Sequence, residues 1–301
     1  MQIGVDLGGS HVGVGIVAEN GKIVIKKEQD LTFSKDNINN TKVYIRDLII
    51  SLINSALREI GAPICLIEKI GVASPGKVEN GIIKDIYNLG IKEFDLAQML
   101  QEYYGVEVRV KNDAKCAGIA ESKYGALKGE KDAVFLCLGT GIGGATFYNG
   151  KLVEPNRSAG SEYGHMIIQK DGIACNCGNK GCFERYASMR AFKEGIKKIL
   201  KVDDEISSKE LLEKLTKNLD NKEVNEYIDN YIDYLLLGLS NIVNIIEPEV
   251  ICLGGGFVYF EKILYTRLIE KANLNKYKFN KTRFVLAKLE NDAGIIGATL
   301  I

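Results

Sequence analysis

The stretch AVFLCLGTGIGGATFYNGKLV, residues 133–153, decides the fold, because it repeats the order of features at the start of the chain. An apolar strand pattern runs into a glycine-rich turn, a second strand follows, and Asn149-Gly150 predicts a tight hairpin turn into a third. Residues 3–24 have the same order, with Asn20-Gly21 at the corresponding turn. The two copies predict a duplicated α/β unit with a cleft between the copies.

The rest of the chain alternates between strand and helix patterns, as expected for α/β units. Short apolar runs predict strands at 69–74, 106–110, 249–256 and 283–287. Helical periodicity predicts helices at 43–60, 96–104, 113–124, 224–246, 260–272 and 293–301.

Composition narrows the classes of function. The 301 residues include 39 basic and 39 acidic ones, so no bulk charge attracts DNA or an anionic membrane, and we expect no nucleic-acid partner. The chain opens directly on a strand pattern, and no run of eighteen uncharged apolar residues occurs, so we expect a soluble, cytoplasmic protein with no membrane segment. Four cysteines stand singly in apolar runs and are predicted to be reduced core residues: Cys65, Cys116, Cys137 and Cys252.

Three glycine clusters follow predicted strands, at 6–10, 139–144 and 254–256. Glycine lets main-chain N–H groups approach phosphate oxygens, so three clusters together indicate a nucleotide site. For any single cluster, a strand turn that needs glycine for its own backbone is the commoner explanation. The pattern at 139–144 runs into a strand, so it is neither a Walker loop nor a Rossmann turn that opens a helix.

Asp113 stands where a strand pattern meets a helix pattern, which suits a general base at the open end of an α/β sheet. The alternative is that Asp113 is only the N-cap of that helix. Glu162, His165 and Glu184 would suit a polyhydroxyl substrate, and the alternative for both glutamates is an exposed surface position.

A cysteine cluster lies between these glutamates. Cys175, Cys177 and Cys182 are too close together, and odd in number, for a disulfide framework. With His165 they complete a Cys₃His set, which is the ligand set of a structural Zn²⁺ site. We therefore expect a closed zinc site that joins the loop of Glu162 to the helix start at Glu184, rather than a redox switch.

The ordered motifs VDLGGS, NDA, LGTGIGG, EYGH, CNCGNKGCFE and LGGGF resemble those of the ROK family of repressors, uncharacterised frames and sugar kinases, over nearly the whole chain. This resemblance implies a two-lobed actin-like ATPase and sugar-kinase fold, with duplicated RNase H-like domains and a cleft between them. The N-terminal lobe is expected at 1–117, with the terminal helix 292–301 packing back on it. The larger lobe is expected at 118–291 and carries the zinc-binding loop.

The resemblance also implies ATP-dependent phosphorylation of a hexose, with glucose ranked first, in the presence of Mg²⁺ and structural Zn²⁺. Asp113 matches the general base. The sugar-binding positions are Gly76, Asn88, Asn112, Asp113, Glu162, His165 and Glu184, with one nitrogen of His165 holding zinc and the other facing the sugar. The ATP-binding positions are Asp6, Gly8, Gly9 and Ser10, then Gly139, Thr140, Gly141, Gly143 and Gly144, then Gly254, Gly255, Gly256 and Phe257. The zinc ligands are His165, Cys175, Cys177 and Cys182, and family members are homodimers or tetramers.

Departures from the family pattern keep other functions open. Ser10 replaces a frequent threonine and Ser161 a frequent glycine, while Lys77 and Ile91 differ near the expected sugar pocket. N-acetylmannosamine and N-acetylglucosamine are therefore the next sugars. The alternatives from a different class are a non-catalytic sugar sensor and a transcriptional regulator, which would need a DNA-binding domain where only Met1 precedes the first strand.

Overall fold

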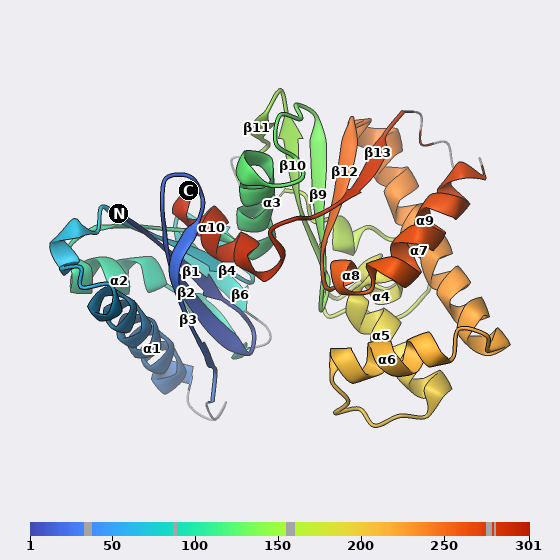
Figure 1. Ribbon diagram of the computed structural model, residues 1–301, viewed down its shortest axis with the longest axis horizontal. Coiled ribbons are helices and arrows are strands. Elements are labelled where there is room, and N and C mark those ends of the chain that lie inside the picture. Colours follow the sequence, from blue (N-terminus) through green and yellow to red (C-terminus); the bar gives the residue numbers. More distant parts are fainter. Residues whose placement is uncertain (33–37, 87–88, 155–159, 275–278, 280) are drawn as a thin grey trace. The chain divides into compact units, whose positions relative to one another are not determined.

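The computed structural model describes residues 1–32, 38–86, 89–154, 160–274, 279 and 281–301, and its chain forms two compact units (Figure 1). Unit 1 contains Met1–Gly129, Leu152–Gly160 and Leu289–Ile301, and unit 2 contains Glu130–Lys151 and Ser161–Lys288. The predicted lobes divide the chain at residue 117 instead. Unit 1 extends to Gly129 because residue 117 falls inside a helix, α3 (Asp113–Tyr124), that packs as a whole on unit 1.

Unit 1 is built on a five-stranded sheet of order β3-β2-β1-β4-β8. The first two pairs are antiparallel, whereas β4 runs parallel to β1 and β8 runs parallel to β4. The strands are β1 (Gln2–Leu7), β2 (His11–Val17), β3 (Ile23–Asp30), β4 (Lys69–Ser74) and β8 (Glu107–Asn112).

Unit 2 repeats this sheet with the order β11-β10-β9-β12-β13. As in unit 1, β10 is antiparallel to β9, whereas β12 runs parallel to β9 and β13 runs parallel to β12. The strands are β9 (Ala133–Leu138), β10 (Ile142–Tyr148), β11 (Lys151–Leu152), β12 (Val250–Gly255) and β13 (Arg283–Leu286). The duplicated α/β fold that residues 133–153 predict is confirmed.

Helices cover both faces of the unit 1 sheet (Figure 1). The apolar faces of α1 (Ile38–Glu59) and α2 (Leu96–Tyr104) bury side chains such as Ile49 and Leu100 against one face. On the other face, α10 (Ala293–Thr299) packs against α3, β1 and β4, in a small core that contains Cys116 and Ala298. The terminal helix thus belongs to unit 1, although it is last in sequence.

Unit 2 has a larger core beneath its helices. Its centre is α7 (Lys222–Ile246), in which Tyr231 is buried against Phe192. The Tyr231 hydroxyl donates to the carbonyl of Ala187 at 3.0 Å. The other helices are α4 (Glu184–Ala187), α5 (Met189–Leu200), α6 (Ser208–Lys217), α8 (Gly256–Tyr259) and α9 (Glu261–Asn273).

Some parts differ from the sequence prediction. A three-stranded sheet in unit 1, of β5 (Lys77–Glu79), β6 (Ile82–Ile86) and β7 (Ile91–Phe94), was not predicted. The prediction of a buried Cys65 is wrong: it lies exposed in a 3-10 turn, Ile64–Leu66, whose flanking apolar side chains are also exposed. Cys116 and Cys252 are buried as predicted, and Cys137 is half-buried.

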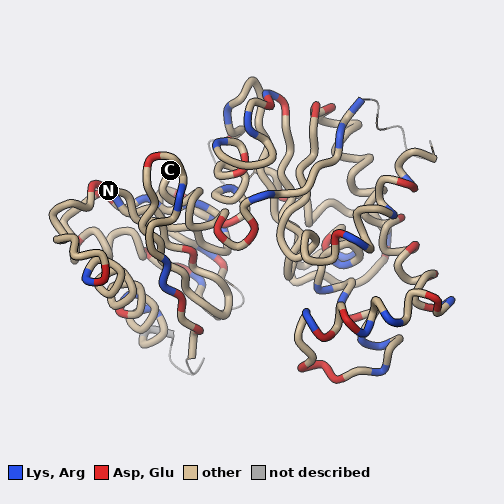
Figure 2. Tube along the Cα trace, in the orientation of Figure 1, with Lys and Arg blue, Asp and Glu red and all other residues tan. Residues whose placement is uncertain are grey.

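The distribution of charged and apolar residues agrees with what the sequence predicts. Basic and acidic residues are interspersed along both units (Figure 2). Among the described residues, no helix is both long and apolar enough to span a membrane.

Candidate functional site

The predicted site residues of unit 1 lie at the carboxyl ends of neighbouring parallel strands. Asp6 of β1 pairs with Ala73 of β4, and Ser74 of β4 pairs with Asn112 of β8. The carboxyl ends of parallel strands are where α/β sheets place their ligands. The topology therefore brings Asp6, Asn112 and Asp113 to one edge of this sheet.

The N-cap of α3 decides whether Asp113 serves only to cap the helix. Asn112, not Asp113, is the N-cap, because its side chain accepts from the backbone N–H of Lys115 at 3.3 Å. The alternative that Asp113 is the N-cap is thus wrong. Asp113 is the first residue of the helix, and its Oδ1 accepts from the N–H of Ala114 at 2.7 Å.

Asn112 also contacts Gly76, another predicted sugar-binding residue. Its Nδ2 donates to the carbonyl oxygen of Gly76 at 3.1 Å, so the loop between β4 and β5 is held against the start of α3. Gly76 has a φ of 85°, and a Cβ there would lie 2.4 Å from the carbonyl oxygen of Lys84. Glycine is therefore required by the backbone at this position, whatever binds there.

Asp6 is electrostatically linked to Asp113. Burial, with repulsion from Asp113, raises the pKa of the Asp6 carboxyl to about 7, against the opposing effect of Lys26. The glycine turn that follows Asp6 is closed by a hydrogen bond of 2.8 Å from the N–H of Gly8 to the carbonyl of His11. The His11 ring lies against Gly8, and His11 is not among the side chains of the Cys₃His cluster.

In unit 2 the second and third glycine clusters lie side by side. The second cluster follows β9 and the third begins at the end of β12, which is the parallel neighbour of β9. Gly254 and Gly255 pair with Cys137 and Leu138. The N-terminus of α5 closes the group, since the N–H of Arg190 donates to the carbonyl of Gly139 at 3.1 Å.

The backbone requires glycine at some positions of these clusters and not at others. Gly255 has a φ of 68° and lies against the Leu138 carbonyl, so its own backbone requires glycine. At Gly139, by contrast, φ is ordinary and an added Cβ would meet no described atom within 4 Å. Packing in unit 2 therefore does not account for glycine at 139.

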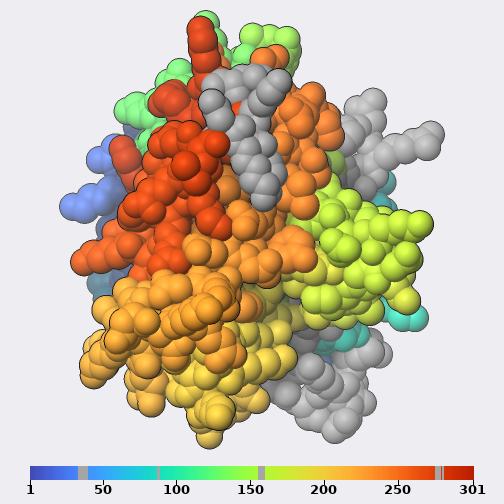
Figure 3. Space-filling model, turned by 90° about the vertical axis from the view of Figure 1, so that its right-hand side faces the viewer, coloured from blue at the N-terminus to red at the C-terminus, as the bar shows by residue number. Residues whose placement is uncertain are grey.

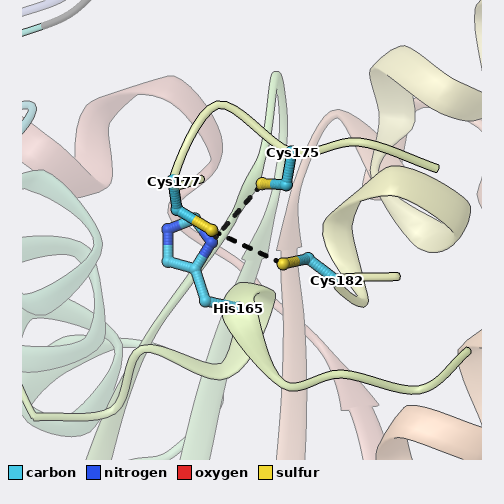
Figure 4. A group of neighbouring side chains, drawn as sticks. All are labelled: His165, Cys175, Cys177 and Cys182. Atoms are coloured by element: carbon cyan, nitrogen blue, oxygen red, sulfur yellow. Dashed lines mark hydrogen bonds between the residues drawn. The ribbon is translucent and has the colours of Figure 1, made fainter. Parts of the chain in front are cut away.

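The predicted zinc ligands converge. Figure 4 shows His165, Cys175, Cys177 and Cys182 turned toward one another, and their ligand atoms all lie within 4.8 Å of each other. Among the described residues they form the one group of three or more His, Cys, Asp or Glu side chains close enough to share an ion. His165 comes from the 3-10 turn η3 (Tyr163–His165), whereas the cysteines come from the following loop, most of which is exposed at the surface of unit 2 (Figure 3, yellow-green).

The spacing within this cluster fits zinc. Two sulfurs bound tetrahedrally at about 2.3 Å from Zn²⁺ are about 3.8 Å apart. The Sγ atoms of Cys177 and Cys182 are separated by 3.6 Å, and Cys175 Sγ lies 3.8 Å from His165 Nδ1. Burial, together with Glu184, raises the pKa of the Cys175 thiol to about 12, and a divalent cation would reverse this direction by stabilising the thiolate. The Cys₃His cluster therefore fits a structural zinc ion.

Glu184 joins the cluster to the second glycine turn. Its Oε1 lies 3.2 Å from Cys175 Sγ and 3.9 Å from His165 Nδ1. A Cβ on Gly141 would lie 2.4 Å from its other carboxylate oxygen, Oε2. Glu162 directly precedes η3, and its side chain is exposed.

Asn88 falls outside the described residues. Thr146 was not predicted as a site residue, although its hydroxyl lies 2.7 Å from that of Ser161, next to Glu162. The sequence signal for this contact is Ser161 itself, which stands where the family frequently has glycine. Its φ of 70° lies in the left-handed region that favours glycine.

Known proteins match this chain throughout. The chain is 32% identical to a glucokinase from Thermotoga maritima, over 99% of this chain and 96% of that one. It is 25% identical to a xylose repressor from Caldicellulosiruptor bescii, over 98% of this chain and 76% of the repressor. The structure of a ROK family glucokinase from Streptomyces griseus, in complex with glucose and AMPPNP, shares the fold with a TM-score of 0.83, at 24% identity, over 99% of this chain and 97% of that one.

The sheet order repeated in both units is that of the actin-like sugar-kinase fold, to which this structural neighbour belongs. The model of the ROK family matches residues 2–301, which include the three glycine clusters, the Asn112-Asp113 pair and the cysteine cluster. From this match and the Thermotoga maritima relative, we conclude that the chain belongs to the ROK family.

Proposed function

We propose that this protein transfers the γ-phosphoryl group of ATP to a hydroxyl of a hexose, with glucose as the first candidate. The observation that supports this proposal most is the position of Asp113, beside Asn112 at the carboxyl end of β8 and electrostatically linked to Asp6 at the end of β1. Glucokinases among the relatives match this chain over nearly its full length.

In this proposal, Asp113 orients the sugar hydroxyl and accepts its proton as the O–P bond forms. A loose phosphoryl-transfer transition state needs positioning and charge stabilisation more than a strong base. An ionised carboxylate is suited to both tasks, because it accepts a hydrogen bond from the hydroxyl in the ground state. Asn112 fixes the helix start and holds the Gly76 carbonyl, so the position of Asp113 is set by the backbone on either side of it.

The glycine turns are proposed to bind the nucleotide. The N–H groups of Gly8 and Gly139 donate within their own turns, so other main-chain N–H groups of 8–10 and 139–144 would donate to phosphate oxygens. Residues 254–257 would contact the adenosine side. Mg²⁺ supplies neutralisation of the phosphate charge when bound, with ATP itself providing several of its ligands. The adjacent positions of the second and third glycine clusters support one continuous nucleotide surface in unit 2.

Sugar hydroxyls are proposed to bind Glu162, His165 and Glu184. Zinc on the Cys₃His cluster supplies rigidity, since it would connect η3 with the start of α4 through His165 and Cys182. Nδ1 of His165 faces the cluster, which leaves Nε2 for a sugar hydroxyl.

N-acetylmannosamine and N-acetylglucosamine are the next candidate acceptors. A structural neighbour described as a putative N-acetylmannosamine kinase from Listeria monocytogenes is 25% identical over 99% of this chain. A non-catalytic sensor or regulator is the alternative from a different class, favoured by the xylose repressors among the relatives.

A coupled assay of ADP release across a sugar panel tests the proposal. We expect glucose-dependent ADP release, or release with one of the two N-acetylhexosamines. Sugar binding without ADP release for every sugar would favour the sensor, and binding of neither sugar nor ATP would contradict both.

A further inference from the structure

We infer that Thr146 and Ser161 form a positioning pair that fixes Glu162 for its ligand. The inference rests on the proposed function, in which Glu162 binds sugar hydroxyls. Neither residue is expected to touch the sugar, so both would act through the backbone of Glu162.

Both neighbours of Glu162 are bonded to one side chain of β10. The Thr146 Oγ1 atom lies 2.7 Å from Ser161 Oγ and 2.5 Å from the Tyr163 hydroxyl. Thr146 is only 8% exposed, as is Tyr163, so these bonds are shielded from competition by water. The residue before Glu162 and the residue after it are therefore held at the same point of the sheet.

The backbone at Ser161 shows why a hydroxyl is needed here. With φ at 70°, Ser161 is in the left-handed region, which a serine adopts at a cost that a glycine does not have. The hydrogen bond to Thr146 opposes that cost, since it forms only when Ser161 Oγ is directed at β10. A glycine would accept the same φ but would leave this end of the segment untied.

Close packing fixes the other end. A Cβ on Gly164 would lie 2.3 Å from the carbonyl oxygen of Ile142, and one on Gly144 would lie 2.7 Å from the Tyr163 ring. The 3-10 turn η3 thus packs directly on β10, and His165 at its end belongs to the Cys₃His cluster.

Glu162 itself is left available. Its carbonyl accepts from the N–H of His165 at 3.1 Å, which fixes its backbone. Its side chain is exposed, and no hydrogen bond or ion pair of its carboxylate is found among the described residues. A carboxylate on a backbone anchored at both sides, with no partner in the described part of the chain, is preorganised for an external one.

Thr146→Val tests the pair because it removes the hydroxyl at nearly constant volume. We expect the KM for the sugar to rise at least about tenfold, because the bonds of Thr146 to both Ser161 and Tyr163 are lost, while the KM for ATP stays within about twofold. Thr146→Ser restores a hydroxyl and should restore the sugar KM. Ser161→Gly should raise the sugar KM without lowering the melting temperature, because glycine tolerates the left-handed backbone.

Thr299→Val is the matched control. Thr299 is also buried, and its hydroxyl donates to the Ile296 carbonyl within α10 of unit 1. Thr299→Val should lower the free energy of unfolding about as much as Thr146→Val does, and it should leave the KM values for sugar and ATP unchanged. If Thr146→Val changed the two KM values equally, or changed neither, the positioning role would be wrong.

Glu162→Gln separates this inference from the proposed function. A raised sugar KM for Glu162→Gln with none for Thr146→Val and Ser161→Gly would overturn the positioning pair alone. An unchanged sugar KM for Glu162→Gln would overturn the sugar-binding role of Glu162, and with it the basis of the inference.

Discussion

The Glu184 Oε1 atom lies 3.2 Å from the Sγ of Cys175, so a carboxylate proposed to bind sugar is in contact with a ligand of the zinc cluster. The same carboxylate lies against Gly141 of the second glycine turn. Any loosening of the Cys₃His cluster should therefore reach both the carboxylate proposed to bind sugar and the glycine turn proposed to bind phosphate.

Removal of one zinc ligand should weaken sugar binding as well as the fold. Cys177→Ser, or a strong chelator, is expected to release zinc, lower the melting temperature by several degrees and weaken sugar binding about tenfold or more. Zinc content, thermal unfolding and sugar titration check this. Cys65→Ser is the control, because Cys65 is exposed in unit 1 and should change none of the three. Zinc-free protein with unchanged sugar affinity and melting temperature would contradict the structural role of the metal.

A methyl group at residue 139 should affect the nucleotide and not the fold. An added Cβ on Gly139 meets no described atom, so Gly139→Ala should leave the free energy of unfolding within about 0.5 kcal/mol. If phosphate oxygens approach this backbone, the KM for ATP should rise at least about tenfold while the KM for the sugar stays the same. Chemical denaturation and initial rates measure both quantities. An unchanged KM for ATP would remove Gly139 from the phosphate site.

The raised pKa of Asp6 predicts a pH-dependent stability. Its carboxyl has an ordinary pKa of 3.8 and a folded-state pKa of about 7, so between these values the folded protein binds more protons than the unfolded chain. The free energy of unfolding of the ligand-free protein should therefore fall as pH rises, by about 2 kcal/mol between pH 5 and pH 7 from this group. Asp6→Asn should flatten the curve over that window. Parallel curves for the parent and the variant would show that Asp6 does not titrate there.

A buried carboxylate ties the terminal segment to unit 1. Glu121 of α3 is fully buried, and its two oxygens accept from the N–H groups of Ala126 and Leu289, at 2.6 Å and 2.7 Å. Glu121→Gln replaces one acceptor with a donor, which should lower the free energy of unfolding by about 1 to 3 kcal/mol. Denaturant titration checks the value, with exposed Glu102→Gln as the control. A loss no larger than that of the control would contradict the role of Glu121.

The parts of the fold that sequence predicted are those fixed by local chemistry. Asn149 and Gly150 both have positive φ, 51° and 75°, as a two-residue hairpin turn requires, and Asn and Gly adopt this region at low cost. The Cys₃His cluster was also predictable, because four soft ligands within eighteen residues have few other uses.

Other parts depend on contacts that a sequence does not record. Cys65 stands in an apolar run, yet the turn at Ile64–Leu66 leaves it exposed, since periodicity gives no direction in so short a segment. The strands β5 to β7 are too short for a clear alternation. The Thr146–Ser161 bond joins residues fifteen apart, and only tertiary folding of η3 on β10 creates it.

The central claim is that Asp113 is the base of a sugar kinase, and Asp113→Asn tests it most directly. The substitution keeps the size of the side chain, and capping of α3 by Asn112 leaves the helix start intact. The measurement is the rate of ADP release at saturating ATP and sugar, with sugar affinity determined by titration on the same protein. We expect turnover to fall by about 10²-fold or more while sugar affinity changes less than about fivefold. Turnover close to that of the parent protein would contradict the claim.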